Sequence, residues 1–295
     1  MTAGVGSQRT GPFIVTKEHR RFTAFAHAMC THRTIGVCFG PAGVGKTLSA
    51  RCHAHWDLAE PLLHAWGPRE PSDAHVYAAL ARSRTVFSTP TVGGTLRELR
   101  QDLHLLTSRV ESCIEQHHRL NSDGQRGVAR DRRIALIIID EAERLSTSAL
   151  EHRRDMFDRT PLGLMFIGMP GIEKRLARYP QLYSRVGFAH HYRPLHDDEL
   201  TFVLTRHWRQ LGLSLDSADF TDTQAMAAIS RITRGNFRLL HRLFVQLERI
   251  LRINELHVIT EDVVEAARST LVIGATCVED GAPFIDSGHT CGRGL

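Results

Sequence analysis

The chain has 295 residues, of which 42% are hydrophobic, and it carries a formal net charge of +5. This length and composition allow one large or two modest domains with a buried core, and they exclude a disordered chain. No uninterrupted apolar stretch approaches membrane-spanning length and the first residues show no secretion pattern, so we expect a cytoplasmic protein without membrane contact. The positive charge permits an anionic partner but does not identify one.

The elements expected at the amino-terminal end lead into a glycine-rich loop. Residues 1–15 are expected to form a flexible arm, after which Thr16 caps a helix that continues to about His32. The run Thr34–Phe39 (TIGVCF) is short, apolar and partly β-branched, which predicts a strand. Beyond the loop, Leu48–Ala54 contains no Gly or Pro and predicts a helix.

The loop between this strand and helix, GPAGVGKT, fits the phosphate-binding pattern G-x-x-x-x-G-K-[ST]. Its glycines let the backbone curl so that N–H groups point at phosphates, while Lys46 adds a positive charge and the Thr47 hydroxyl reaches Mg²⁺. An ordinary glycine-rich turn is the alternative, but the flanking strand and helix disfavour it. We therefore expect ATP and Mg²⁺ as cofactors. The expected nucleotide contacts are Gly40, Pro41, Ala42, Gly43, Val44, Gly45, Lys46, Thr47 and Leu48.

The middle of the chain is expected to alternate helices with strands. Residues 57–84 give no clear pattern, because prolines and a glycine interrupt them at Pro61, Gly67, Pro68 and Pro71. The elements expected after them are a strand at Thr85–Ser88, a helix at Thr95–Arg119, a polar loop at Asn121–Arg133, a strand at Ile134–Ile139, a helix at Leu145–Phe157, a strand at Leu162–Ile167, a helix at Gly171–Tyr179 and a strand at Phe188–Tyr192. This alternation predicts an α/β fold with a parallel sheet covered by helices on both faces.

Two carboxylates follow the strand Ile134–Ile139, which is apolar throughout and therefore typical of a strand buried on both faces. We expect Asp140 to hold Mg²⁺ through water and Glu141 to polarise the attacking water. The alternative is an acidic helix start, since Glu141-Ala142-Glu143 also suits a helix N-terminus. The phosphate loop upstream favours the catalytic interpretation.

Strand patterns stop at Asp197. Helices are expected at Asp197–Leu211, Thr221–Thr233, Phe237–Arg252 and Thr260–Leu271. These patterns predict an α/β nucleotide-binding domain at residues 16–195, a small all-helical lid domain at 196–273 and a disordered tail at 274–295.

Cysteine and histidine spacings do not indicate a metal site. The six cysteines form no C-x-x-C pair, and none of the 18 histidines lies in an H-E-x-x-H pattern. We interpret the cysteines as reduced thiols and the histidines as residues that do not bind metal.

Several segments, in this order, resemble an AAA+ ATPase: GPAGVGKT, DEAERL, LMFIGMPG, YSRVGF and TRGNFRLL. The resemblance covers residues 14–272. The stretch FIGMPGIEKRLARYPQLYSRVGFAHHYRPL is more narrowly similar to the transposition ATPases of the MuB, TnsC and TniB group. The resemblance implies a P-loop NTPase core followed by a helical lid, ATP hydrolysis, and assembly into a homo-oligomeric ring or filament.

Two arginines take their expected roles from this resemblance. Arg185 matches the arginine that reaches into a neighbouring subunit's site and completes the neutralisation of γ-phosphate charge. It could instead be a surface arginine, and Arg175, Arg178 and Arg193 are nearby competitors. Arg238 matches the second sensor on the lid, although a lid arginine facing water is the alternative.

One position departs from the pattern of the family. Met169 stands where many AAA+ proteins place a polar sensor that orients the attacking water, and a thioether accepts hydrogen bonds poorly. Slow hydrolysis would follow, which suits a switch better than a motor. Ser146 or Thr147 is an alternative source of the missing hydroxyl.

Arginines also gather at two places outside these motifs. One pair, Arg97 and Arg100, follows a Gly-Gly turn, and a second group comprises Arg126, Arg130, Arg132 and Arg133. Such groups are more often solvated faces than nucleic-acid contacts, but in a ring or filament even a few per subunit would line a DNA channel. No base-reading motif is present, so any binding to double-stranded DNA is expected to be non-specific.

The resemblance thus implies an ATP-dependent DNA-binding regulator of transposition, which assembles on DNA and recruits or stimulates a transposase. Two alternatives remain open. The first is an ATPase switch in a secretion or signalling assembly without DNA, and the second is a helicase loader or a protein like a replication initiator.

Overall fold

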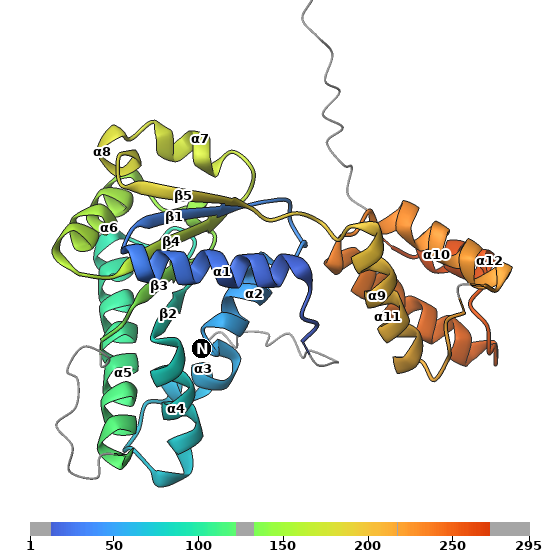
Figure 1. The fold of residues 1–295 in the computed structure, drawn as a ribbon, viewed down its shortest axis with the longest axis horizontal. Coiled ribbons are helices and arrows are strands. Elements are labelled where there is room, and N and C mark those ends of the chain that lie inside the picture. The colour runs from blue at the N-terminus through green and yellow to red at the C-terminus, as the bar shows by residue number, and fades with distance from the viewer. Residues whose placement is uncertain (1–12, 122–132, 217, 272–295) are drawn as a thin grey trace, which may run out of the picture.

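The computed structural model describes residues 13–121, 133–216 and 218–271. Its centre is a sheet of five strands in the order β2-β3-β4-β1-β5, with every neighbouring pair parallel (Figure 1). The strands are β1 (Ile35–Phe39), β2 (Thr85–Ser88), β3 (Leu136–Ile139), β4 (Gly163–Gly168) and β5 (Val186–His191). The parallel sheet expected from the alternating pattern is confirmed.

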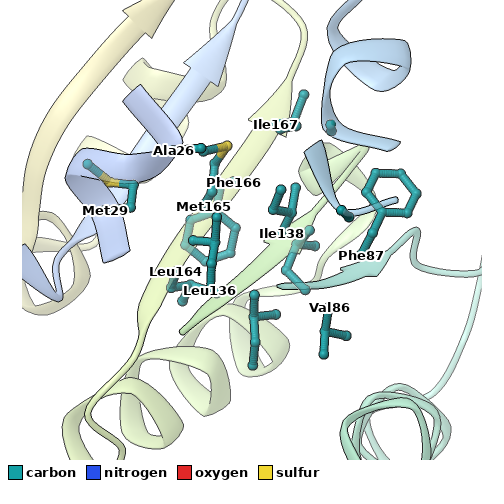
Figure 2. Packing of buried hydrophobic residues seen from close by; sticks show 14 of the residues in the cluster. Ala26, Met29, Val86, Phe87, Leu136, Ile138, Leu164, Met165, Phe166 and Ile167 are labelled. Atoms are coloured by element: carbon teal, nitrogen blue, oxygen red, sulfur yellow. The ribbon is translucent and has the colours of Figure 1, made fainter. Parts of the chain in front are cut away.

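The inner strands are apolar because both of their faces are covered. Every residue of β3 and of β4 is buried, whereas every residue of the edge strand β5 is exposed or half-buried. Figure 2 shows Met29 beside the side chains of β4, and Ile138 of β3 beside Phe87 of β2. Burial on both faces explains why these strands lack the alternation of polar and apolar residues that a half-exposed strand would show.

Helix α1 (Lys17–His32) lies across one face of the sheet, in front of the strands in Figure 1. It begins where the Thr16 hydroxyl accepts a hydrogen bond from the backbone N–H of His19, at 3.1 Å, as the sequence predicts. Its approach to β4 is close: a Cβ on Gly163 would lie 2.6 Å from the carbonyl oxygen of Met29. A side chain at Gly163 would therefore push the helix off the sheet.

The remaining helices of this part of the chain lie in the connections between the parallel strands. They are α2 (Lys46–His53), α3 (Trp56–Ala65), α4 (Ala74–Ser83), α5 (Leu96–Asn121), α6 (Thr147–Arg159), α7 (Ile172–Ala177) and α8 (Pro180–Tyr183). The chain crosses the sheet in one direction from β1 to β2 and in the opposite direction from β2 through β3 to β4. Right-handed crossovers then place helices on both faces. The connections that leave the neighbouring strands β1 and β4 run in opposite directions, which makes the loop after β1 part of a topological switch point.

The helices after β5 enclose a second hydrophobic cluster. They are α9 (Asp197–Gln210), α10 (Phe220–Thr233), α11 (Phe237–Ile253) and α12 (Glu261–Ser269), and their apolar faces meet around Trp208 and Leu240. Asn236 caps α11, because its side chain accepts hydrogen bonds from the N–H groups of Arg238 and Leu239. The helical region expected after the sheet is confirmed.

Backbone hydrogen bonds hold both ends of the short connection between the sheet and these helices. The N–H of Tyr192 donates to Phe39 at 2.8 Å, and the N–H of Leu195 donates to Gly235 at 3.0 Å. The start of α1 is tied to α9 as well: the backbone N–H of Lys17 donates to Glu199, at 2.6 Å, and its ammonium group pairs with Asp198. The two hydrophobic clusters are therefore joined by polar contacts.

The structure differs from the sequence analysis mainly in residues 57–84. This segment forms α3 and α4 around a 3₁₀ turn (Pro71–Asp73), and Pro61 lies inside α3. The interruption expected at Pro61 is wrong, because Trp56, Ala59 and Leu63 bury one face of α3 and offset the hydrogen bond that proline removes. Helix α8 and the 3₁₀ turn Ala142–Arg144 were not expected.

Some expectations fall outside the described residues. The polar loop before β3 is described only at its ends, most of the amino-terminal arm is not described, and the expected disordered tail lies beyond residue 271. Among the described helices, none combines the length and the apolar character needed to cross a membrane.

Candidate functional site

A cavity of about 970 Å³ lies at the carboxyl-terminal edge of the sheet, between the loop after β1 and helix α11. The loop after β1 lines one side, residues that follow β3 and β4 line the floor, and α11 lines the opposite side. Ligands of open parallel sheets bind at this edge, at a switch point where the connections of two neighbouring strands run in opposite directions. The cavity therefore lies where the sequence predicts a nucleotide site.

The loop from Gly40 to Gly45 is shaped by glycines at positions that other residues would strain. Gly43 and Gly45 have φ angles of 81° and 111°, in the left-handed region that favours glycine. A Cβ on Gly40 would lie 2.2 Å from the carbonyl oxygen of Tyr192, and one on Gly43 would lie 2.5 Å from Oδ1 of Asn236. Helix α2 starts directly afterwards, so its first N–H groups have no intrahelical acceptor and favour an anion.

Lys46 lies buried behind this loop. Its ammonium group donates to the carbonyl oxygens of Gly40 and Pro41 at 2.5 and 2.7 Å, which leaves one of its three N–H donors for another acceptor. Burial lowers the pKa of Lys46, and the nearby Cys38 and Asp140 oppose this shift. A phosphate group beside Lys46 would favour the charged ammonium.

Thr47 and Asp140 meet on the floor of the cavity. The Thr47 hydroxyl donates to Oδ2 of Asp140 at 2.7 Å, and Oδ1 of Asp140 accepts from the backbone N–H of Glu141 at 2.9 Å. Asp140 is only 3% exposed, and this burial raises the pKa of its carboxyl group against the opposing effect of the Thr47 hydrogen bond. One hydroxyl and one carboxylate are the hard oxygen ligands that Mg²⁺ prefers, so these residues fit that cation.

Glu141 lines the same cavity with an unusual backbone. Its φ angle is 49°, and its carboxylate pairs with Arg144 one turn of chain later. A non-glycine residue in the left-handed region is strained, and such strain is common at functional sites. Glu143, which the sequence analysis assigned no catalytic role, also lines the cavity, with its carboxylate against Gly168.

Met169 follows β4 directly, is 40% exposed and lines the cavity. It occupies the position at which the sequence analysis noted the absence of a polar sensor. The hydroxyls of Ser146 and Thr147, which were the alternative to that sensor, take part in other hydrogen bonds. The Ser146 hydroxyl caps α6, and Thr147 shares a hydrogen bond with Tyr179. Neither lies among the described residues that line the cavity.

Helix α11 reaches the phosphate loop through its first residues. The side-chain amide of Asn236 donates to the carbonyl oxygen of Ala42 at 2.8 Å, and the backbone N–H of Arg238 donates to Gly43 at 3.1 Å. Arg238 also lines the cavity. The contact of Asn236 was missed, although an asparagine before an apolar helical run is a sequence signal for a helix cap.

Arg185 lies apart from this cavity, directly before β5. Its Nε and Nη2 atoms donate to the two oxygens of Asp158 on α6, at 2.5 and 2.9 Å, and this pairing lowers the pKa of Asp158. Among its competitors, Arg175 donates to the carbonyl oxygens of Glu143 and Leu145. The structure therefore does not bring Arg185 to the site of its own chain.

A chain of hydrogen bonds beside α2 was also missed. Nδ1 of His19 lies 3.0 Å from the Ser49 hydroxyl, which lies 2.7 Å from the hydroxyl of Tyr192. Burial lowers the pKa of His19, whose ring contacts Phe13 edge-on at 4.6 Å between centroids. All four residues line the cavity. Their spacing along the chain gives no local signal, because α1, α2 and the end of β5 each supply one member of the hydrogen-bond chain.

Comparison with known proteins identifies relatives. The model of the AAA domain family matches residues 28–176. A "Potential ATP-binding protein" from Staphylococcus aureus is 41% identical over 265 residues, which cover 89% of this chain and 97% of that protein.

Solved structures share the fold at low identity. The RuvB Holliday junction branch migration motor of Thermotoga maritima superposes with a TM-score of 0.53 at 17% identity, covering 87% of this chain and 69% of RuvB. The ORC2 protein of Aeropyrum pernix, in its ADPNP-ADP complexes, gives 0.53 at 14% identity, covering 90% of this chain and 70% of ORC2. Together with the family match and the S. aureus relative, these likenesses lead to one conclusion: the chain belongs to the AAA domain family.

Proposed function

We propose that this protein is an ATP-dependent, DNA-binding regulator of DNA transposition, which assembles on double-stranded DNA and recruits or stimulates a transposase. The observation that carries the ATP-dependent part is the cluster of Lys46, Thr47, Asp140 and Glu141 around one cavity, closed on its other side by α11. The transposition part is supported by the stretch from Phe166 to Leu195, which resembles transposition ATPases.

Each residue of the cavity has a chemical task in this proposal. The loop from Gly40 to Gly45 and the first turn of α2 would hold the phosphates, with the remaining donor of Lys46 directed at them. Thr47 and Asp140 would hold Mg²⁺, which neutralises the charge that develops on the phosphoryl oxygens. Glu141 would orient and polarise the attacking water.

Hydrolysis is proposed to be slow and to depend on assembly. Met169 cannot position water as a hydroxyl or amide would, and Arg185 does not reach the cavity of its own chain. An arginine supplied by a neighbouring subunit would complete the site only in a homo-oligomer, so ATP turnover would report assembly. Such a device suits a switch that sets the lifetime of a complex.

The test is binding to random-sequence duplex DNA with ATP, ADP or no nucleotide. We expect binding that increases with duplex length, is strongest with ATP, and falls by roughly 10³-fold between 50 and 200 mM salt if about six phosphates are neutralised. Lys46→Ala is the matched variant, since it should lose the ATP effect. ATP-loaded protein that ignores duplex DNA at low salt would refute the proposal and favour a switch without DNA.

A second measurement separates transposition from replication. Purified protein with ATP and DNA is tested for stimulation of a transposase encoded beside its gene, with Glu141→Gln as a variant that holds the assembled state. Stimulation of strand transfer supports the proposal. Loading of a replicative helicase, without any effect on a transposase, would instead support the helicase-loader alternative.

A further inference from the structure

A second cavity lies between helices α5 and α6, away from the proposed nucleotide site. Its volume is about 1400 Å³, and it extends from the first turns of α5 to the residues that precede β3 and β4. Its basic residues are Arg97, Arg100, His104, Arg133, His152 and Arg153. Glu111 and Glu115 lie farther along α5, so positive charge gathers in the half of the groove nearer the start of α5.

Arg153 forms the buried part of this groove. It is only 3% exposed, and its Nη2 donates to the carbonyl oxygen of Leu99 at 2.9 Å, while its Nε has no hydrogen-bond partner within the described part of the chain. Burial, helped by the charge of Arg100, lowers the pKa of Arg153 to about 10. A buried guanidinium usually has a carboxylate partner, because removing a charge from water is costly. The described residues supply Arg153 with no such partner, so a bound anion would stabilise it.

The exposed arginines of the groove point to the same ligand chemistry. Arg97 lies in the first turn of α5, where the helix dipole disfavours a cation, and Arg100 lies in the second turn. The position of Arg97 therefore does not stabilise the helix by itself. Both side chains line the groove with Arg153, and planar guanidinium groups match phosphate oxygens in pairs.

The basic surface continues beyond the groove. A smaller cavity of about 390 Å³ shares Arg133 with it and adds Arg33 and Arg84. Along α5, the helix rises about 17 Å from Arg97 to Ser108. That length corresponds to about five base-pair steps along the axis of a duplex, so the surface is longer than a single phosphate group.

We propose that the groove between α5 and α6 binds the phosphodiester backbone of duplex DNA through Arg97, Arg100 and Arg153. This inference rests on the proposed function, which supplies duplex DNA as the ligand, and it adds the protein surface that contacts the DNA. Free inorganic phosphate shares the same chemistry and would occupy only part of the groove. An acidic protein segment is the competing occupant.

The first experiment compares the double variant Arg97→Gln/Arg100→Gln with Arg20→Gln/Arg242→Gln, which removes the same charge from exposed positions on other helices. Fluorescence anisotropy on a random-sequence duplex with ATP gives affinity and its dependence on salt. Loss of two phosphate contacts should reduce the slope of log affinity against log salt by about 2, and affinity about 60-fold at 0.1 M salt. ATP affinity should stay at the wild-type value.

The outcomes separate the groove from the proposed function. If wild-type protein binds duplex and the groove variant binds equally well with the same salt slope, the groove proposal is overturned and the function stands. If wild-type protein with ATP does not bind duplex, both fail. Competition against the labelled duplex identifies the ligand, with inorganic phosphate, polyglutamate and unlabelled duplex compared at equal charge. If phosphate or polyglutamate displaces the labelled duplex more readily than unlabelled duplex does, the assignment to DNA is overturned.

Arg153→Met tests whether Arg153 has only a structural role. The proposal expects weaker DNA binding with a melting temperature, measured without DNA, that is unchanged or higher, because an uncompensated buried charge has been removed. A lower melting temperature with unchanged DNA affinity would show that Arg153 only holds α6 to Leu99. If Arg153→Met does not fold, the comparison of the Arg97→Gln/Arg100→Gln variant with its control still tests whether the groove binds DNA.

Discussion

Asn236 has two separate roles, since it holds α11 against the phosphate loop and also caps that helix. Variants of Asn236 can therefore test the contact with the loop separately from the stability of the helix. The carboxamide oxygen of Asn236 caps α11, while its nitrogen donates to Ala42. Asn236→Ser keeps an oxygen for the cap but is too short to reach Ala42. Asn236→Ala removes both interactions.

The expected magnitudes follow from these two roles. A neutral hydrogen bond contributes about 0.5–1.5 kcal/mol net, so loss of the bond to Ala42 should weaken ATP binding about 2- to 12-fold in both variants. Loss of the cap should lower the free energy of unfolding by about 1 kcal/mol in Asn236→Ala only. The bond matters for ATP because the nucleotide can contact the loop and α11 together only while they are held against each other.

The assay is titration with a fluorescent ATP analogue, paired with chemical denaturation without nucleotide. Thr260→Ala is the matched control, since Thr260 caps α12 by accepting from Val263 and does not line the cavity. This control should lower stability and leave ATP affinity unchanged. Wild-type ATP affinity in Asn236→Ser would refute the role assigned to the contact.

Four further predictions concern the cavity and its neighbours. Lys46→Ala should weaken ATP binding at least tenfold, about 1.4 kcal/mol, in the same titration, and unchanged affinity would mean that the loop is not the site. Glu141→Gln should bind ATP but hydrolyse it far more slowly in a phosphate-release assay, whereas wild-type turnover would exclude Glu141 as the base. Arg185→Ala should bind ATP without turnover, and mixing it with Lys46→Ala should restore some activity; no recovery despite confirmed co-assembly would argue against a shared site. Burial, together with His241, lowers the pKa of His207 to about 4. The contribution of the neutral ring to the free energy of unfolding is therefore complete above pH 6.5 and is lost as the pH falls toward 4, by up to about 3 kcal/mol. His207→Leu should flatten this part of the curve of unfolding free energy against pH, and a curve identical to that of the wild type would count against the shift.

Local patterns predicted the parts of the fold that local chemistry determines. The loop after β1, the cap at Thr16 and the buried run of β3 depend on residues within a few positions of one another, so spacing alone reveals them. Helix α3 shows the limit. A proline normally argues against a helix, and only the burial of Trp56 and Leu63 against the rest of the molecule explains why this helix forms.

The parts of the site that were missed depend on contacts between distant residues. Asn236 and Ala42 are 194 positions apart, and their hydrogen bond exists because α11 packs against the loop after β1. Arg153 could not be distinguished from other helical arginines, because its burial depends on how α5 lies beside α6. A sequence pattern reports the face on which a side chain lies, but not the distant segment that covers it.

The connection after β5 restricts how the helices α9–α12 can move relative to the sheet. Tyr192 is fixed to Phe39 and Ser49, and Leu195 is fixed to Gly235, so only Arg193 and Pro194 lie between the two anchored positions. Proline fixes its own φ near −65° and restricts the preceding residue to extended conformations. With so few free torsions in this joint, and with α11 also held to the phosphate loop through Asn236, the helices can rotate about the joint more readily than they can slide along the sheet edge. Because the joint adjoins Gly40, a displacement of the phosphate loop acts close to the pivot, and a small shift there becomes a larger movement at the far end of α11.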